Sequence, residues 1–222
     1  HLRLHLARGA RHGPRRDHAD RPRGRPRLAP LGRLTGTALD TDVLVVGGGP
    51  AGASVATWLA RAGHHVTVVE KRPVARHKAC GDAITPRALR ELTLLDVDPM
   101  SLGGHRLAGV RLVHGARSVT APWPRHVDVP DHATALRRDL LDGHLRSRAA
   151  DSGAAVLMGH QATAPIVERG FVRGATLATD PALDANAEHH EDARARVVLV
   201  AAGANSSFGR DLGTTRQRHW PY

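Results

Sequence analysis

The sequence predicts an α/β fold organised around a parallel β-sheet. An apolar run, Val43 to Val46, leads directly into the glycine spacing Gly47-x-Gly49-x-x-Gly52, and a second apolar run ends on the acidic residue Glu70. Uninterrupted apolar runs are typical of parallel strands buried on both faces. Two such runs with a helix-length segment between them indicate a βαβ unit.

The segment between the two runs has the pattern of a helix. Ala51, Val55 and Leu59 recur every four residues, which predicts one apolar helix face. Gly63 follows where a left-handed residue commonly ends a helix. Residues 66–69 are expected to form the second strand.

The glycine spacing and the acid together predict a site for the pyrophosphate and ribose of a dinucleotide. Gly47 would let the chain turn off the strand, Gly49 would let a phosphate approach the backbone, and Gly52 would let the helix lie close to the strand. The helix N-terminus, which includes Pro50 and Ala51, offers N–H groups and a positive dipole end to the phosphates. Glu70 is placed to accept hydrogen bonds from ribose hydroxyls.

Composition narrows the class of protein. The chain has 222 residues, of which only 3% are aromatic, so its core must be aliphatic and rich in alanine. Cys80 is the single cysteine, which excludes an internal disulfide and fits a reducing, cytoplasmic compartment. No apolar run approaches the roughly 20 residues of a membrane-spanning helix, and no signal-peptide pattern is visible.

The net charge of +11 is concentrated in the first 40 residues. That segment contains ten arginines against Asp17, Asp20 and Asp40 and therefore carries +7. It is rich in Arg, His, Pro and Gly, and we predict that residues 1–40 form a disordered Arg/Pro-rich arm. Because the remainder is only mildly basic and the arm has no interleaved aromatic residues, a nucleic-acid partner is not expected.

Further elements are predicted along the rest of the chain. The apolar patterns indicate helices at Pro86–Leu95 and Thr134–Ala150, a paired set of strands at Val110–Val113 and Ser118–Ala121, further strands at Ala154–Met158, Ala162–Glu168 and Val172–Ala178, a loop at Asp180–Arg194, and a central parallel strand at Val197–Ala201. His189-His190-Glu191 lies in that loop and lacks the HExxH zinc pattern, because position 194 is Arg. We therefore predict no metal site.

Four segments make the chain similar to flavoproteins of the geranylgeranyl reductase family, within the two-domain FAD oxidoreductases that include aromatic-ring hydroxylases. They are the βαβ unit with Glu70, the stretch Lys78-Ala79-Cys80-Gly81-Asp82 with Thr85-Pro86-Arg87 behind it, Arg138-Asp139-Leu140-Leu141-Asp142, and the run from Val197 to Gly213. The second segment is the most specific to the reductase branch. The fourth departs from many relatives, since Ala202-Gly203 replaces their Asp-Gly.

The resemblance implies a Rossmann-like FAD-binding domain with a partial β-rich substrate region. It assigns Gly47, Gly49, Pro50, Ala51 and Gly52 to the FAD pyrophosphate and Glu70 to the adenosine ribose, with Lys71 beside the adenosine. It also implies that Arg138 reaches the FAD phosphates, for which a guanidinium is suited; the alternative is a solvent-facing arginine. Gly203, in the second small-residue turn, is a further cofactor-binding candidate.

Cys80 and Gly81 resemble the pair that lies beside the flavin ring in this family. A thiol there could tune reactivity, and Cys80 is the catalytic candidate. The alternative for Cys80 is a buried cysteine that behaves as a small apolar residue. The flavin itself would carry the hydride chemistry, with NADPH or another external electron donor as the reductant.

The resemblance covers residues 41–222, and we expect this part to be a truncated FAD-binding domain with substrate-region strands around residues 104–130. The family has a later Gly-Asp-Ala motif beyond the fourth segment, and no such motif follows Gly213 in this sequence; the Gly-Asp-Ala at residues 81–83 belongs to the second segment. The expected function is reduction of isoprenoid double bonds in a geranylgeranyl lipid or a menaquinone side chain, with contact to the inner membrane face. The alternatives are an FAD-dependent monooxygenase of aromatic or quinone substrates, and an inactive fragment of such an enzyme.

Overall fold

The computed structural model describes residues 2–8, 34–35, 38–73, 82–180, 190–204 and 206–213. The chain divides into two compact units. Unit 1 comprises His1–Arg27 and His77–Leu141, and unit 2 comprises Leu28–Arg76 and Asp142–Tyr222. Each unit contains its own sheet, and the two are described separately.

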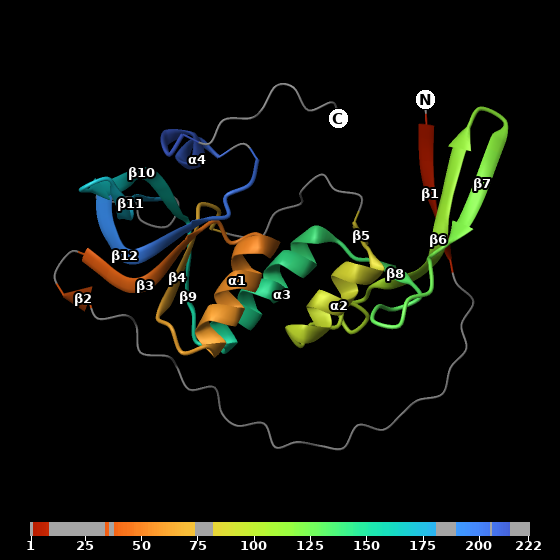
Figure 1. Cartoon of the computed structure of the whole chain (residues 1–222), viewed down its shortest axis with the longest axis horizontal. Coiled ribbons are helices and arrows are strands. Elements are labelled where there is room, and N and C mark those ends of the chain that lie inside the picture. Colours follow the sequence, from red (N-terminus) through yellow and green to blue (C-terminus); the bar gives the residue numbers. More distant parts are fainter. Residues whose placement is uncertain are drawn as a thin grey trace, which may run out of the picture. The chain divides into compact units, whose positions relative to one another are not determined.

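Unit 1 contains an antiparallel sheet (Figure 1). Its strands, in spatial order, are β1 (Leu2–Arg8), β6 (His105–His114), β8 (Ala133–Ala135) and β5 (Ala83–Ile84), and β7 (Arg117–Pro122) pairs with β6. Helix α2 (Pro86–Leu94) begins after Thr85, whose hydroxyl accepts a hydrogen bond from the N–H of Ala88. The predicted strand pair is confirmed, because Val110 lies opposite Ala121 and Val113 opposite Ser118.

Unit 2 contains a mixed sheet. Its strands, in spatial order, are β10 (His160–Glu168), β11 (Phe171–Thr179), β12 (His190–Val200), β3 (Ala38–Val46), β4 (Val66–Glu70) and β9 (Ala155–Met158), and β2 (Leu34–Thr35) pairs with β3. The strands from β12 to β9 are parallel, whereas β11 is antiparallel to both of its neighbours, β10 and β12. This arrangement confirms the α/β fold.

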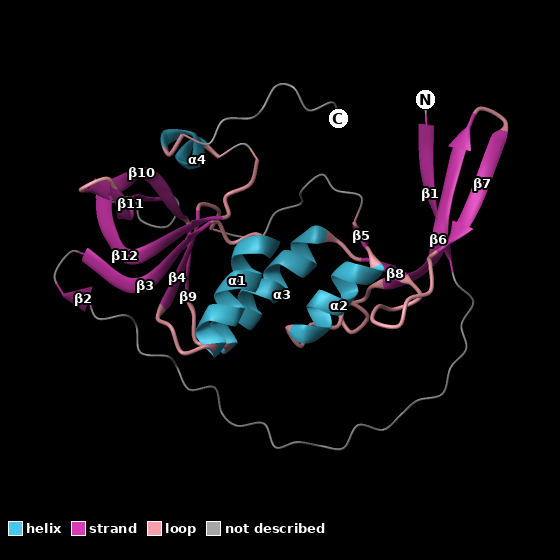
Figure 2. Ribbon diagram, in the orientation of Figure 1, coloured by secondary structure: helices cyan, strands magenta, loops and turns pink. Residues whose placement is uncertain are grey.

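Successive side chains of β3 and β4 point to opposite faces of the unit 2 sheet, and a hydrophobic core lies on each face. On one face Val45 and Val68 pack with Ala56 of helix α1 (Pro50–Arg61) and Ala149 of helix α3 (Arg138–Asp151). On the other face Leu44, Val46 and Val69 pack with residues of β10–β12 and with Phe208 of helix α4 (Ser207–Asp211). Figure 2 shows α1 and α3 side by side, next to β4 and β9 of this sheet. Both faces of β3 and β4 are therefore covered, as their apolar runs predict. In β12, by contrast, Val197 and Val200 are exposed.

Two boundaries predicted from sequence are wrong. The helix expected at Thr134–Ala150 begins at Arg138, because Thr134 belongs to β8 and pairs with Ile84 and Arg106. Thr134 is fully buried, so its place is set by strand pairing rather than by the helical pattern that follows it. The loop expected at Asp180–Arg194 already contains β12 from His190 onwards. There Ala193 and Ala195 are buried while Asp192 and Arg194 are exposed, a period-two pattern of a strand.

The expected disorder of residues 1–40 does not hold for Leu2–Arg8, which forms β1 and pairs with β6 from Leu2 opposite His114 to Arg8 opposite Leu107. The alternating Leu2, Leu4 and Leu6 is the strand signal in this segment. Most of the remaining arm lies outside the described residues.

The predicted apolar face of α1 is confirmed in part, because Val55 and Leu59 are half-buried and pack against the core that contains Ala56. Ala51 is exposed, whereas Gly52, Ala53, Ala56 and Thr57 are buried. Because the residues on this face are small, the helix can lie close to the sheet. The expected end of the helix at Gly63 is confirmed, since this residue has a φ of +88°. The N–H of Gly63 donates to the carbonyl of Ala60, and the N–H of His64 donates to the carbonyl of Leu59.

Candidate nucleotide-binding site

The glycine loop lies where the carboxyl ends of three parallel strands meet. The N–H of Gly47 donates to the carbonyl of Val69 in β4 at 2.8 Å, and the N–H of Ala201, just after β12, donates to the carbonyl of Val46 at 2.8 Å. Gly47 has a φ of +106°, and a Cβ on it would lie 2.6 Å from the carbonyl oxygen of Ala201. Only glycine fits this turn, because of both its backbone conformation and the neighbouring chain. Ligands of parallel α/β sheets bind at such strand ends.

Glu70, at the end of β4, is bonded directly to the glycine loop. One carboxylate oxygen accepts a hydrogen bond of 2.9 Å from the N–H of Gly48, and the other accepts one of 3.1 Å from the N–H of Arg72. A carboxylate oxygen can accept more than one hydrogen bond. Glu70 is therefore oriented by the backbone and keeps acceptor capacity for a further donor, as a ribose contact requires.

The same hydrogen bond explains why residue 52 is a glycine. In a trans peptide the N–H and the preceding carbonyl point in opposite directions. Because the N–H of Gly48 points to Glu70, the carbonyl of Gly47 points away from Glu70, and it lies 1.9 Å from where a Cβ of Gly52 would be. A side chain at Gly52 would thus collide with the peptide that Glu70 orients.

Arg146 of α3 holds the next peptide of the loop. Its Nη1 donates to the carbonyl of Gly48 at 3.1 Å, across 98 positions in the sequence. A Cβ on Gly48 would lie 3.2 Å from Cδ of Arg146 and 3.0 Å from Cβ of Glu70. Gly48 therefore lies between these two side chains and bonds to both. Arg146 did not stand out in the sequence, because nothing local to α3 indicates that contact.

Gly49 faces open space. Apart from its chain neighbours, no atom of the described residues lies within 4 Å of the position that its Cβ would take. Gly49 is the N-cap residue of α1, and no side chain caps this helix. Pro50 follows in the first helical turn, which contains no acidic residue. The N–H groups at the start of this helix, including that of Ala51, therefore meet no negative side chain of the turn, which suits an anionic phosphate.

The structure brings most of the predicted cofactor-binding residues together in unit 2. Gly47, Gly49, Pro50, Ala51 and Gly52 form the loop and the helix start, and Lys71 is exposed directly after Glu70. Gly203 has a φ of +85° in the turn after β12, the strand whose end contacts Gly47. Arg138 is the first residue of α3 and belongs to unit 1. Cys80 and Gly81 lie outside the described residues.

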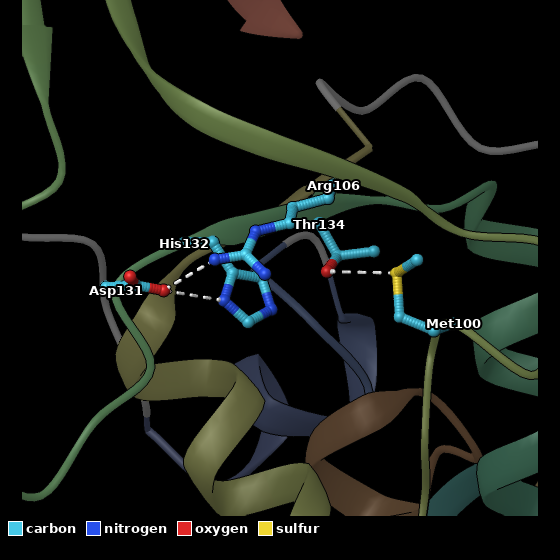
Figure 3. A network of polar contacts seen from close by, with 5 residues as sticks. All are labelled: Met100, Arg106, Asp131, His132 and Thr134. Atoms are coloured by element: carbon cyan, nitrogen blue, oxygen red, sulfur yellow. Dashed lines mark hydrogen bonds and ion pairs between the residues drawn. The ribbon is translucent and has the colours of Figure 1, made fainter. Parts of the chain in front are cut away.

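A separate polar cluster lies in unit 1, where the substrate-region strands are expected (Figure 3). Asp131 accepts a hydrogen bond of 2.7 Å from Nη2 of Arg106 and lies 3.2 Å from Nδ1 of His132. The hydrogen bond with His132, followed by the charge of Arg106, holds the pKa of Asp131 below its usual range. Beside it, the buried Thr134 donates to the sulfur of Met100. The cluster ties the segment before β8 to β6, which is a structural role.

Among the residues that the structure describes, none of the helices combines the length and the apolar character required to span a bilayer.

A parallel α/β sheet, a glycine loop opening a helix and an oriented acid at the next strand end together define a dinucleotide-binding domain. The chain belongs to the family of FAD-binding domains: the family model described as "FAD binding domain" matches residues 40–221. The expectation of FAD as the cofactor is confirmed at this level. The open space at Gly49, the close packing at Gly47 and Gly52, and the oriented Glu70 fit the pyrophosphate and ribose of FAD.

The chain is similar to curated reductases over much of its length. It is 36% identical over 181 residues to the menaquinone reductase of Mycolicibacterium smegmatis, which covers 82% of this chain and 42% of that protein. It is 32% identical over 175 residues to the digeranylgeranylglycerophospholipid reductase of Methanoculleus marisnigri, which covers 78% of this chain and 41% of that protein. The chain thus spans less than half of the length of these relatives.

The fold is also found in a solved structure. A geranylgeranyl bacteriochlorophyll reductase-like protein from Thermoplasma acidophilum superposes with a TM-score of 0.63 at 30% identity, over 80% of this chain and 43% of that one. The resemblance to the geranylgeranyl reductase family is therefore confirmed. An anhydrotetracycline hydroxylase from Streptomyces rimosus matches with a TM-score of 0.61 at 21% identity and shares the fold.

Proposed function

We propose that this chain is the nucleotide-binding part of an FAD-dependent reductase that saturates isoprenoid double bonds in a menaquinone side chain or a geranylgeranyl lipid. The observation that supports the proposal is the loop in which Gly48 is hydrogen-bonded to both Glu70 and Arg146. Its shape suits an adenosine and a pyrophosphate, and the chain is similar to a menaquinone reductase and a digeranylgeranylglycerophospholipid reductase. FAD, when bound, supplies the redox chemistry that amino-acid side chains lack.

The geometry of the loop supports a role for each of several residues. Gly49 and the N-terminus of α1 would bind the pyrophosphate through backbone N–H groups. Glu70, held by two backbone N–H groups, would accept hydrogen bonds from the adenosine ribose, with Lys71 nearby. Gly47 and Gly52 keep the loop tight against β12 and α1, and Gly203 belongs to the adjoining turn.

The remaining assignments rest on the family resemblance. Arg138 would reach the phosphates, and Cys80 with Gly81 would lie beside the flavin ring. The reductant would be NADPH or another external donor. Because the substrate is a lipid, the protein would work in the cytoplasm at the surface of the inner membrane.

The first test is cofactor binding by the purified chain. After reconstitution with FAD and removal of free cofactor, we expect visible flavin absorbance to remain with the protein and to be lost in Gly49→Ala. A chain that retains no flavin under these conditions would contradict the proposal and support an inactive fragment.

The second test identifies the reaction. The flavin-loaded chain is incubated with a reductant, NADPH or dithionite, and with a menaquinone or a geranylgeranyl lipid. The mass of the product is then measured by mass spectrometry. A gain of two hydrogen atoms is the expected result. A gain of one oxygen atom in the presence of air would instead establish the monooxygenase alternative, and flavin binding without turnover would restrict the chain to cofactor binding.

A further inference from the structure

We infer that Arg146 is a positioning residue for the pyrophosphate: by holding the carbonyl of Gly48, it directs the N–H of Gly49 toward the bound phosphates. This inference rests on the proposed function, because it deepens the same nucleotide site. It assigns a role to a residue of α3 that belongs neither to the glycine motif nor to the acid that ends β4.

The first step of the argument is the direction of the peptide between Gly48 and Gly49. Its carbonyl accepts a hydrogen bond of 3.1 Å from Nη1 of Arg146. The chain has no cis peptide bonds among the described residues, so the N–H of Gly49 points opposite to this carbonyl. It therefore points away from Arg146, on the side opposite to α3.

The second step is the space around the Cα of Gly49. Within the described part of the chain, and apart from its sequence neighbours, a Cβ at Gly49 would meet no atom within 4 Å, whereas a Cβ at Gly48 would meet Glu70 and Arg146. The loop is thus closed by side chains at Gly48 and open at Gly49. Open space at a helix N-terminus, where backbone N–H groups lack helical partners, is suited to a phosphate group.

The third step is the rigidity of the loop. Glycine has the most conformational freedom of any residue, and three glycines in a row would have to lose it when a nucleotide binds. The peptide before Gly48 is held by Glu70 and the peptide after it by Arg146. Holding both peptides before binding reduces the entropy lost on binding, which is the general basis of preorganisation.

The fourth step is the support of Arg146 itself. Ala149, three residues further along α3 and on the same helix face, is fully buried in the core shared with Val45 and Ala56. The helix is therefore anchored next to the loop. Arg146 is half-buried, and its aliphatic stem packs beside Gly48.

The test uses the whole chain and two probes, ADP and adenosine, whose affinities are measured by titration calorimetry. Arg146→Met keeps an unbranched stem but removes the donor, and Arg146→Lys keeps a positive donor. Arg90→Met, at an exposed position of α2, controls for the loss of one positive charge. We expect Arg146→Met to weaken ADP binding about tenfold and adenosine binding much less, and Arg146→Lys to restore most of the ADP affinity.

The outcomes separate this inference from the proposed function. Unchanged ADP affinity in Arg146→Met, or an equal loss for ADP and adenosine, would overturn the positioning role while leaving a nucleotide site in place. Equal losses in the Met and Lys variants, with unfolding midpoints like that of the wild type, would overturn it too. If the wild-type chain binds neither probe, both proposals fail. Lack of lipid reduction with the expected ADP pattern would contradict only the proposed reaction.

Discussion

The backbone N–H of Gly48 and the carboxylate of Glu70, 22 residues apart in the chain, are joined by a hydrogen bond of 2.9 Å. The bond connects the loop that opens α1 with the end of β4, so the two halves of the βαβ unit form one site. It also sets the direction of the Gly47 carbonyl, which in turn requires a glycine at position 52. The spacing of the motif is thus explained by contacts inside the protein as well as by the ligand.

Replacing Glu70 with glutamine should weaken nucleotide binding. Two N–H donors point at its two carboxylate oxygens, and the NH₂ group of a glutamine would face one of them. Hydrogen bonds to a charged acceptor contribute about 1.5–3 kcal/mol each, so we expect about tenfold or greater loss of affinity for both ADP and adenosine. Titration calorimetry measures both. Glu91→Gln, on the exposed surface of α2, is the control and should bind like the wild type.

Two glycines of the motif should respond differently to alanine. At Gly49 the backbone is extended and the added methyl meets open space, so the free energy of unfolding should change by no more than about 1 kcal/mol while ADP binding falls at least tenfold. At Gly52 the methyl would lie 1.9 Å from a carbonyl oxygen, and Gly52→Ala should destabilise the fold by about 3 kcal/mol or more. Urea unfolding and ADP titration together check this contrast. Similar effects of the two substitutions would contradict it.

Asp42 should contribute stability that depends on pH. Its carboxylate accepts a hydrogen bond of 3.0 Å from the N–H of His65, and the hydroxyl of Thr41 donates to the carbonyl of the same residue at 2.8 Å. The hydrogen bond from His65 is the main reason that the pKa of Asp42 lies below its usual range.

Because this pKa is lowered by folding, the stabilisation is present above the unfolded-state pKa of about 4 and is lost as the pH falls through the lower folded value. Asp42→Asn should therefore be less stable than the wild type at pH 7, and the difference should shrink below about pH 4. Urea unfolding over this range measures it, with Glu91→Gln as the control. A difference that grows on acidification would contradict the assignment.

Phe208 should be the main anchor of α4. It is 1% exposed and packs in the same core as Leu44, Val69 and Leu177. Phe208→Ala should lower the free energy of unfolding by about 3–5 kcal/mol, the usual cost of emptying such a position. Phe171→Ala, at a position that is 64% exposed, should change it by less than about 0.5 kcal/mol. Equal effects in urea unfolding would show that Phe208 is not buried in solution.

Elements with strong local patterns could be predicted from the sequence. The apolar run of β3, the glycine spacing and Gly63 predicted the βαβ unit, because each depends on residues close together in the chain. Thr134 could not be placed in this way, since its strand of three residues exists only through pairing with β5 and β6. The start of β12 was missed for a related reason: its polar residues face outward from a strand that is paired on both sides.

By itself the sequence determined the class of the site, because the glycines and Glu70 that define it lie within one continuous stretch of chain. The tertiary structure decided which groups hold that site in shape. Arg146 reaches Gly48 across 98 positions, and Ala201 packs on Gly47 from a strand near the other end of the chain. Such contacts are invisible in a local pattern, because they depend on the direction in which a helix and a strand are brought to the loop by the packing of the sheet.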